Sequence, residues 1–256
     1  MLWDASALKG YAIEANDGGL GTVSDLLFED VGWAIRWLVV DTGAWLSGRK
    51  VLLPVWALGQ PDPARHHFPV KLTMQQVKDS PEIDTDRPVS RQDEAQVYNF
   101  YGWNPYWASG AIGVSSNLAM PAIMPLQQVA TGAFGLTGGV PQDDDDDPHL
   151  RSIAAVTGYH INATDGEIGH VETFLVDDAT WSVRYIVVDT RNWWPGEKVL
   201  VSPHSVREIS WSERLLHLDV DREKVRGAPP YTTSAIMDEA YDDAFLSYYG
   251  IGFVPR

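Results

Sequence analysis

The sequence predicts a mainly β protein built from two tandem small β-barrels, each followed by a short α-helix and related to the other by a pseudo-twofold axis. Three observations lead to this fold class. The chain contains a long internal repeat, each copy holds several short apolar strands separated by turn residues, and each copy ends in a capped helical pattern. A hydrophobic content of 45% is that of a folded chain.

The internal repeat has an offset of 148 residues. The segment that begins at Leu8 matches the segment that begins at Val156, and 21 of the 43 positions from Gly10 to Leu52 are identical to their partners. This period is far longer than the roughly 20–50 residues of solenoid repeats. Two copies of this length indicate two domains, or two halves of one pseudo-symmetric unit.

A linker joins the copies. Tyr106 to Gln142 carries no charged residue, and Asp143 to Asp147 is a run of aspartates. Adjacent carboxylates repel each other, whereas known calcium loops space their acidic ligands, so we interpret the run as a solvated tether rather than a calcium site. The predicted organisation is repeat one at 1–105, the linker at 106–150 and repeat two at 151–256.

The strand predictions follow from turns and alternation. Asn16-Asp-Gly-Gly is a tight-turn signal between two short strands and predicts a hairpin. Trp33 to Val40 is mostly apolar at both alternating sets of positions, with Arg36 the charged residue, which predicts a strand buried on most of both faces. Val51 to Val55 and His67 to Thr73 are expected to be further strands. Short strands at close spacing favour a small barrel, which closes its own edges.

A helix is expected at the end of each copy. In repeat one, Ser90 can cap a helix from Arg91 to Tyr101 that stops at Gly102. In repeat two, a cap among Thr232 to Ser234 predicts a helix that reaches Tyr249 and stops at Gly250.

These residues resemble the PRC-barrel family, named after the cytoplasmic barrel of the H subunit of photosynthetic reaction centres. The resemblance covers roughly residues 5–107 and 152–252. The segments that carry it in repeat one are Leu8-Lys-Gly-Tyr, Asp17-Gly-Gly-Leu-Gly-Thr-Val, Arg36-Trp-Leu-Val-Val-Asp-Thr-Gly, Gly48-Arg-Lys-Val-Leu-Leu-Pro and Tyr101-Gly-Trp-Asn-Pro-Tyr-Trp.

The resemblance implies a non-catalytic protein-binding or scaffolding module with a protein partner and no cofactor. In the reaction centre the barrel covers the cytoplasmic face, and in a ribosome-maturation factor a similar barrel contacts a ribosomal protein. An alternative is therefore an accessory protein of photosynthetic reaction-centre electron transfer, which would dock peripherally on a membrane complex.

Composition narrows the classes of function. The chain has no Cys, which excludes disulfides and thiolate chemistry and suits the cytoplasm. A net charge of −16 opposes nucleic-acid binding. We find no signal peptide, no transmembrane segment, and none of the G-x-S-x-G, P-loop or H-E-x-x-H motifs of enzymes. We expect a monomer that forms an intrachain pseudo-dimer, or a homo-oligomer.

Two groups of residues are candidates for interaction or structure. Exposed aromatic side chains commonly anchor protein partners, although these could instead close the barrel ends; they are Trp45, Trp103, Tyr106, Trp107, Trp193 and Trp194. Two pairs of polar residues occupy equivalent positions in the copies, and a structural ion pair or a turn-capping role is the simpler interpretation of each. These residues are Arg36, Asp41, Arg184 and Asp189.

A last alternative is a cryptic metal-binding protein or enzyme that uses the histidines of repeat two. His160, His170 and His204 replace other residue types of repeat one and could meet near Asp165 or Glu167. Unrelated surface histidines are the simpler interpretation, so no metal ligand or catalytic residue is assigned.

Overall fold

The structure, a computed structural model, describes residues 1–81, 83, 89, 91–103, 105, 150–190, 198–229, 231 and 239–250. The linker from 106 to 149, with its Asp run, lies outside the described residues.

Repeat one contains strands, short helices and 3-10 turns. In chain order they are β1 (Leu2–Asp4), α1 (Ala5–Leu8), β2 (Ala12–Ala15), β3 (Gly18–Glu29), β4 (Ile35–Asp41), η1 (Gly43–Leu46), β5 (Lys50–Pro54), η2 (Val55–Ala57), β6 (His67–Pro69), α2 (Met74–Lys78) and α3 (Arg91–Tyr101). The hairpin β2–β3 and the bounds of α3 are as the sequence predicts.

Repeat two has the same plan with one added strand. Its elements are β7 (Leu150–Ser152), α4 (Ile153–Val156), β8 (His160–Ala163), β9 (Gly166–Asp177), β10 (Ser182–Asp189), β11 (Lys198–Val201), η5 (Pro203–Ser205), β12 (Val206–Ser210), β13 (Leu215–Leu218), α5 (Arg222–Arg226) and α6 (Glu239–Tyr249). Elements such as β3 and β9, or α3 and α6, are offset by 148 residues at both ends. The expected cap at Thr232 to Ser234 lies outside the described residues.

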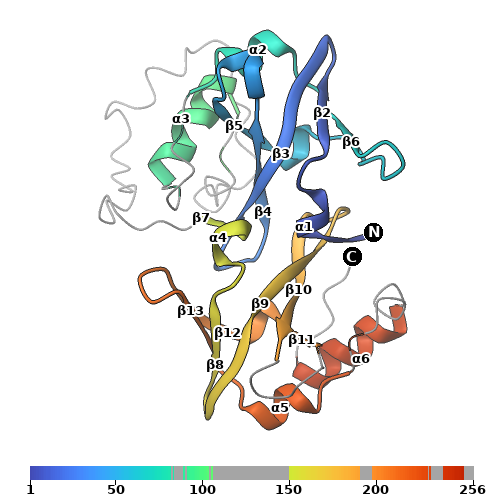
Figure 1. The fold of residues 1–256 in the computed structure, drawn as a ribbon, viewed down its shortest axis with the longest axis vertical. Coiled ribbons are helices and arrows are strands. Elements are labelled where there is room, and N and C mark those ends of the chain that lie inside the picture. Colours follow the sequence, from blue (N-terminus) through green and yellow to red (C-terminus); the bar gives the residue numbers. More distant parts are fainter. Residues whose placement is uncertain are drawn as a thin grey trace, which may run out of the picture.

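The strands form two sheets, one in each half of the molecule (Figure 1). One sheet has the order β5-β4-β3-β2-β6 and the other β11-β10-β9-β8-β13-β12. Each sheet contains one parallel pair, β6 with β2 and β13 with β8. The pairings in the described residues leave both sheets open. A single bridge, Leu58 to Val70, joins the chain beyond β5 to the chain beyond β6. The closed barrels that the sequence predicts are therefore not confirmed.

The strand prediction at His67 to Thr73 is wrong in its second half. The strand β6 ends at Pro69, and Thr73 caps the helix α2 instead. The Thr73 side chain accepts from the backbone N–H of Gln76, and the Gln76 side chain bonds back to the Thr73 backbone. This reciprocal capping satisfies N–H groups that the first turn of α2 leaves free.

The two sheets exchange their first strands. β1 of repeat one pairs antiparallel with β9 of repeat two, and β7 of repeat two pairs antiparallel with β3 of repeat one. β1 pairs with the edge of β9 that β8 occupies further along the strand. In the same way, β7 pairs with the edge of β3 that β2 occupies. In Figure 1, β1, β7, α1 and α4 lie at mid-height, where the two halves meet. The repeats are therefore intertwined rather than strung in series.

Backbone hydrogen bonds also join residues 33–35, at the start of β4, to residues 181–183, at the start of β10; we call this junction of the two repeats, with β1 and β7 beside it, the waist. Ile35 N–H donates to the Trp181 carbonyl at 2.7 Å, and Val183 N–H donates to the Trp33 carbonyl at 2.8 Å. Ala34 and Ser182, which are equivalent residues of the two repeats, face each other across an isolated bridge. Equivalent residues in mutual contact are what a twofold axis through this point requires.

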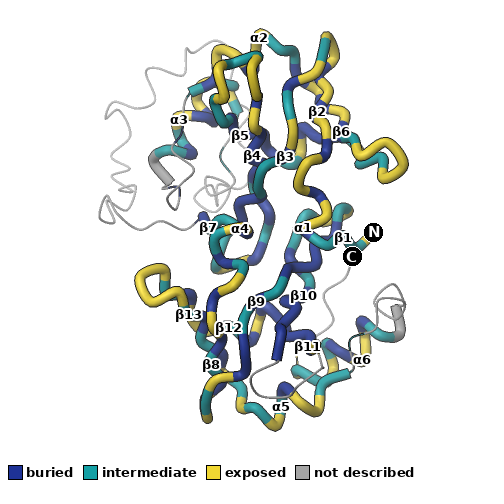
Figure 2. Tube along the Cα trace, viewed as in Figure 1, coloured by how far each residue is buried: buried dark blue, intermediate teal, exposed yellow. Residues whose placement is uncertain are grey.

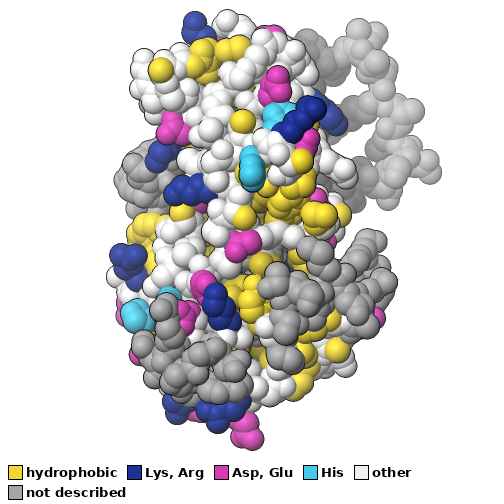
Figure 3. All heavy atoms as spheres, turned by 45° about the vertical axis from the view of Figure 1, so that its right-hand side comes forward, with side chains coloured by type: hydrophobic (Ala, Val, Ile, Leu, Met, Phe, Trp, Pro, Cys, Tyr) yellow, Lys and Arg dark blue, Asp and Glu magenta, His cyan; other side chains and the backbone are white. Residues whose placement is uncertain are grey.

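One hydrophobic core runs through both repeats. It includes Phe28, Val40, Phe174 and Val188, all 0% exposed. Figure 2 shows buried segments of both halves around mid-height, and Figure 3 shows hydrophobic side chains gathered at mid-height on one face. Because the inner faces of both sheets line one core, each repeat supplies part of the other's interior.

The outer face of each sheet is covered by the terminal helix of its own repeat. Trp37 and Val39 of β4 lie in an outer cluster with Val97 and Tyr98 of α3, while Leu38 of β4 lies in the shared core. The prediction that this strand is buried on most of both faces is confirmed. In repeat two, the corresponding outer cluster is built around Phe245 of α6.

Candidate protein-interaction site

An aromatic cluster lies where β5 and α3 end in repeat one. Trp56 sits in η2, directly after β5, while Tyr101 closes α3 and Trp103 follows it. Gly102 has φ +68°, a conformation that favours glycine, and its N–H donates to the Asn99 carbonyl at 3.2 Å. The Trp103 N–H donates to the Tyr98 carbonyl at 2.9 Å. This pair of bonds is the Schellman arrangement, which folds the chain back over the end of the helix.

The rings of the cluster stack tightly and remain accessible. The Tyr101 and Trp103 rings are parallel within 6° at a centroid distance of 4.0 Å, and Trp56 meets Trp103 edge-on at 4.1 Å. Phe100 extends the cluster against Tyr101 at 4.8 Å. Trp56 is 51% exposed and Phe100 is 42% exposed. The cluster is therefore a preformed apolar surface on which Trp56 and Phe100 are about half exposed.

A buried acid holds this cluster in place from below. Glu94 of α3 is 0% exposed and accepts from the Trp37 indole N–H at 2.6 Å. The Trp37 ring also meets Tyr98 edge-on at 5.3 Å. Burial, together with the nearby Glu94, raises the pKa of Tyr98 to about 12. The helix that carries Tyr101 and Trp103 is thereby fixed on the sheet.

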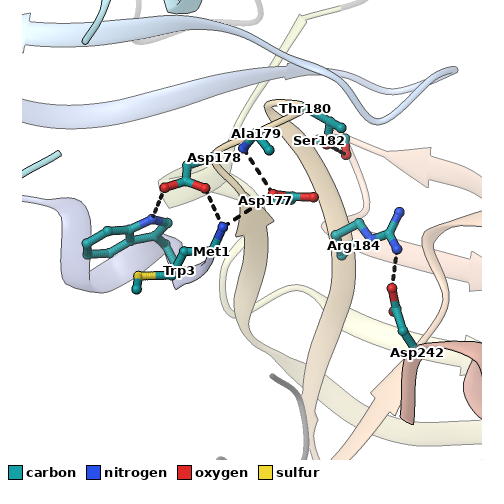
Figure 4. Close-up of polar contacts among 9 residues, drawn as sticks. All are labelled: Met1, Trp3, Asp177, Asp178, Ala179, Thr180, Ser182, Arg184 and Asp242. Carbon is teal, nitrogen blue, oxygen red and sulfur yellow. Dashed lines mark hydrogen bonds and ion pairs between the residues drawn. The ribbon is translucent and has the colours of Figure 1, made fainter. Parts of the chain in front are cut away.

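Repeat two has the equivalent attachment but a different surface. Asp242 of α6 accepts from the Tyr185 hydroxyl and pairs with Arg184 (Figure 4). Burial and the bond to Asp242 raise the pKa of the Tyr185 phenol. The position equivalent to Trp56 is His204, so the cluster of repeat one is not duplicated there.

The structure brings together only part of the predicted aromatic set. Trp103 lies in the cluster, and Trp45, in η1, packs against the shared core and is partly buried. The other predicted aromatic residues, Tyr106, Trp107, Trp193 and Trp194, lie outside the described residues. Sequence reasoning missed Trp56, Tyr101 and Phe100. For Trp56 the available signal was a difference between the copies, because the equivalent position of repeat two holds His204.

The polar residues at equivalent positions have mostly different partners. Arg36 pairs with Glu29, with Nε to Oε2 at 2.9 Å, whereas Arg184 pairs with Asp242. Asp41 accepts from the Gly43 N–H at 2.8 Å, which caps the turn after β4.

Asp189 lies 3.7 Å from a nitrogen of His170. Each of these four carboxylate or guanidinium groups thus makes contacts within the fold.

Two of the three candidate histidines of repeat two are cross-strand neighbours, because His160 of β8 lies opposite His170 of β9. His160 pairs with Glu167 at 2.9 Å, His170 lies beside Asp189, and His204 is exposed in η5. Asp165 instead accepts from the Arg222 N–H at 2.9 Å. Over the described ranges, no group of three or more His, Asp or Glu side chains is arranged to hold a metal ion.

Membrane crossing and known relatives add little further. No helix in the described part of the chain has the length and apolarity that crossing a bilayer requires.

No family model matches the chain. An uncharacterized protein of Deinococcus radiodurans is 36% identical over 96 residues, which cover 33% of this chain and 34% of that protein. The chain therefore matches only about a third of that relative's length. The PRC-barrel resemblance, with its reaction-centre alternative, stays a prediction.

Proposed function

We propose that the chain is a non-catalytic protein-binding module, of the barrel type that the sequence resembles, and that the aromatic cluster of repeat one is its binding surface. The observation that carries the proposal is the stack of Trp56, Trp103 and Tyr101, with Trp56 half exposed. Exposed Trp and Tyr side chains are enriched among the residues that dominate protein interfaces. Because the stack is preformed, its side chains lose little conformational entropy when a partner binds.

The partner we propose is a basic segment of another protein. The net charge of −16 raises the local concentration of basic partners and speeds their encounter. Arg side chains also bind to the faces of Trp and Tyr rings through cation–π contacts. A segment that combines Arg with apolar anchors fits both the charge of the chain and the rings of the cluster.

The test compares two exposed tryptophans. Tagged wild type, Trp56→Ala and Trp211→Ala are used to capture partners from the native host, and the affinity of any partner is then measured for all three proteins. Trp211 is 38% exposed in repeat two and makes a matched control. We expect a basic partner that keeps its affinity for Trp211→Ala and loses about tenfold or more for Trp56→Ala.

Two outcomes would contradict the proposal. One is a partner whose affinity is the same for all three proteins, which would place the binding surface elsewhere. The other is the absence of any partner from the soluble and the membrane fractions. Circular dichroism of the folded variants shows that a loss of binding is not a loss of structure.

A further inference from the structure

The exchanged strands carry a polar contact on each side of the waist. On one side Asp4, at the end of β1, accepts from the Thr173 hydroxyl of β9 at 2.5 Å. On the other side the acid belongs to the host strand, because Asp25 of β3 accepts from the Ser152 hydroxyl and from the Ala154 N–H at 3.0 Å. Each contact joins one carboxylate to neutral donors.

These two contacts lie at equivalent positions of the two repeats, but the carboxylate and the hydroxyl have changed strands. Asp4 and Ser152 are equivalent residues of the repeats, as are Asp25 and Thr173. In one contact the exchanged strand brings the carboxylate, and in the other the host strand holds it. Asp4 and Ser152 also cap α1 and α4, so either residue type suits the first position.

The contact made by the preceding residue of each exchanged strand has its donor and its acceptor on the same strands on both sides of the waist. The Trp3 indole N–H donates to Asp178 at 3.0 Å (Figure 4), and Arg151 Nε donates to the equivalent acid, Asp30, at 2.7 Å. Both exchanged strands thus present a donor here, and both hosts present an aspartate. This contact would accept either repeat, so it does not discriminate between them as the Asp4 and Asp25 positions do.

A pair of two copies of repeat one would place Asp4 directly against Asp25, once on each side of the waist. Burial already raises the pKa of Asp25, so the site is a poor place for one charge and a worse one for two. A pair of two copies of repeat two would place Ser152 against Thr173, both uncharged. Like charges placed opposite each other at an interface discriminate strongly against the wrong partner.

We infer that the waist is a pairing interface that selects its partner: the exchange surface of repeat one accepts repeat two and rejects a second copy of repeat one, through the charge complementarity of positions 4 and 25 with positions 152 and 173. The surface therefore fits partners that carry the repeat-two pattern at these positions. This inference does not depend on the proposed function of the aromatic cluster.

The test recreates the rejected contact within the full chain. Thr173→Asp sets a carboxylate against Asp4, as a pair of repeat-one copies would, and we expect the unfolding midpoint to fall by about 5 °C or more. The double variant Asp4→Ser with Thr173→Asp recreates the contact on the other side of the waist. We expect it to recover at least about half of the loss.

Two controls separate charge from size and capping. Thr173→Asn has nearly the same size as Thr173→Asp and still donates to Asp4, so its midpoint should stay near that of the wild type. Asp4→Ser alone should cost little, because Ser caps a helix as Asp does. An unchanged midpoint for Thr173→Asp, or no recovery in the double variant, would overturn the inference. If Thr173→Asp fails to fold, folding of the double variant supports the inference and its failure contradicts it.

Discussion

Gly21 and Gly169 occupy equivalent positions in the long strands β3 and β9, with φ of +142° and +135°. A Cβ at Gly21 would lie 2.0 Å from the carbonyl oxygen of Asp41, and one at Gly169 would lie 2.0 Å from that of Asp189. The backbone of the neighbouring strand leaves no room for a side chain at either position. The shared glycine is therefore required by the close approach of two backbones.

Alanine at these glycines tests that requirement. We expect Gly21→Ala and Gly169→Ala each to lower the free energy of unfolding by about 2 kcal/mol or more, because the strand must shift away. Gly19→Ala is the matched control in the same strand, since a Cβ there meets nothing within 4 Å. Urea unfolding gives the three values. Equal values for Gly21→Ala and Gly19→Ala would show that the close approach is absent.

Asp25 predicts a dependence of stability on pH. Burial raises its pKa above the ordinary value of 3.8, so the folded state holds the proton more tightly than the unfolded state does. The stability that this pKa shift contributes is fully present below pH 3.8 and is lost as the pH rises through the pKa of the folded state. Asp25→Asn cannot ionise and still accepts from the Ala154 N–H. Measured by urea unfolding at several pH values, the wild type should lose stability relative to Asp25→Asn as the pH rises. Parallel curves for the two proteins would contradict this account.

At the scale of elements, the attachment of α3 to its sheet combines apolar packing with a hydrogen bond between Glu94 and Trp37 that the sequence did not reveal. The bounds of α3 were predictable because Asp93 and Glu94 in its first turn and Gly102 after its end are local signals. The bond between Glu94 and Trp37 spans 57 residues, and no local signal marks it. The exchanged strands are three residues long, which is too short for a periodic pattern. Non-local pairing was therefore the part of the fold that the sequence could not predict.

Removing the Trp37 indole N–H tests the attachment. We expect Trp37→Phe to lower the free energy of unfolding by about 1–3 kcal/mol, because the buried Glu94 carboxylate loses a donor. Hydrogen exchange should show faster opening of α3 while the amides of β9, in the other sheet, keep their protection. Uniform loss of protection across both sheets would instead mean that α3 and the core unfold together.

At the scale of the whole molecule, the repeat in the sequence predicted pseudo-twofold symmetry but not how the copies join. Tandem copies in series and copies that exchange strands have the same repeat in their sequences. The difference lies in which sheet receives Leu2 to Asp4 and Leu150 to Ser152, and only the structure shows it. Leu150, which the sequence analysis placed at the end of the linker, is the first residue of an exchanged strand. Of the aromatic cluster, the sequence analysis named Trp103 alone and missed Trp56, Tyr101 and Phe100.

The measurement that tests the intertwined pair most directly is to cut the covalent link between the repeats. A specific protease site is placed between residues 106 and 149, the folded chain is cut, and its mass is measured under native conditions. The account predicts that the two halves stay together at the mass of the whole chain and separate only on unfolding, because β1 and β7 hold each repeat in the other's sheet. Separation into two folded halves on cutting would contradict it.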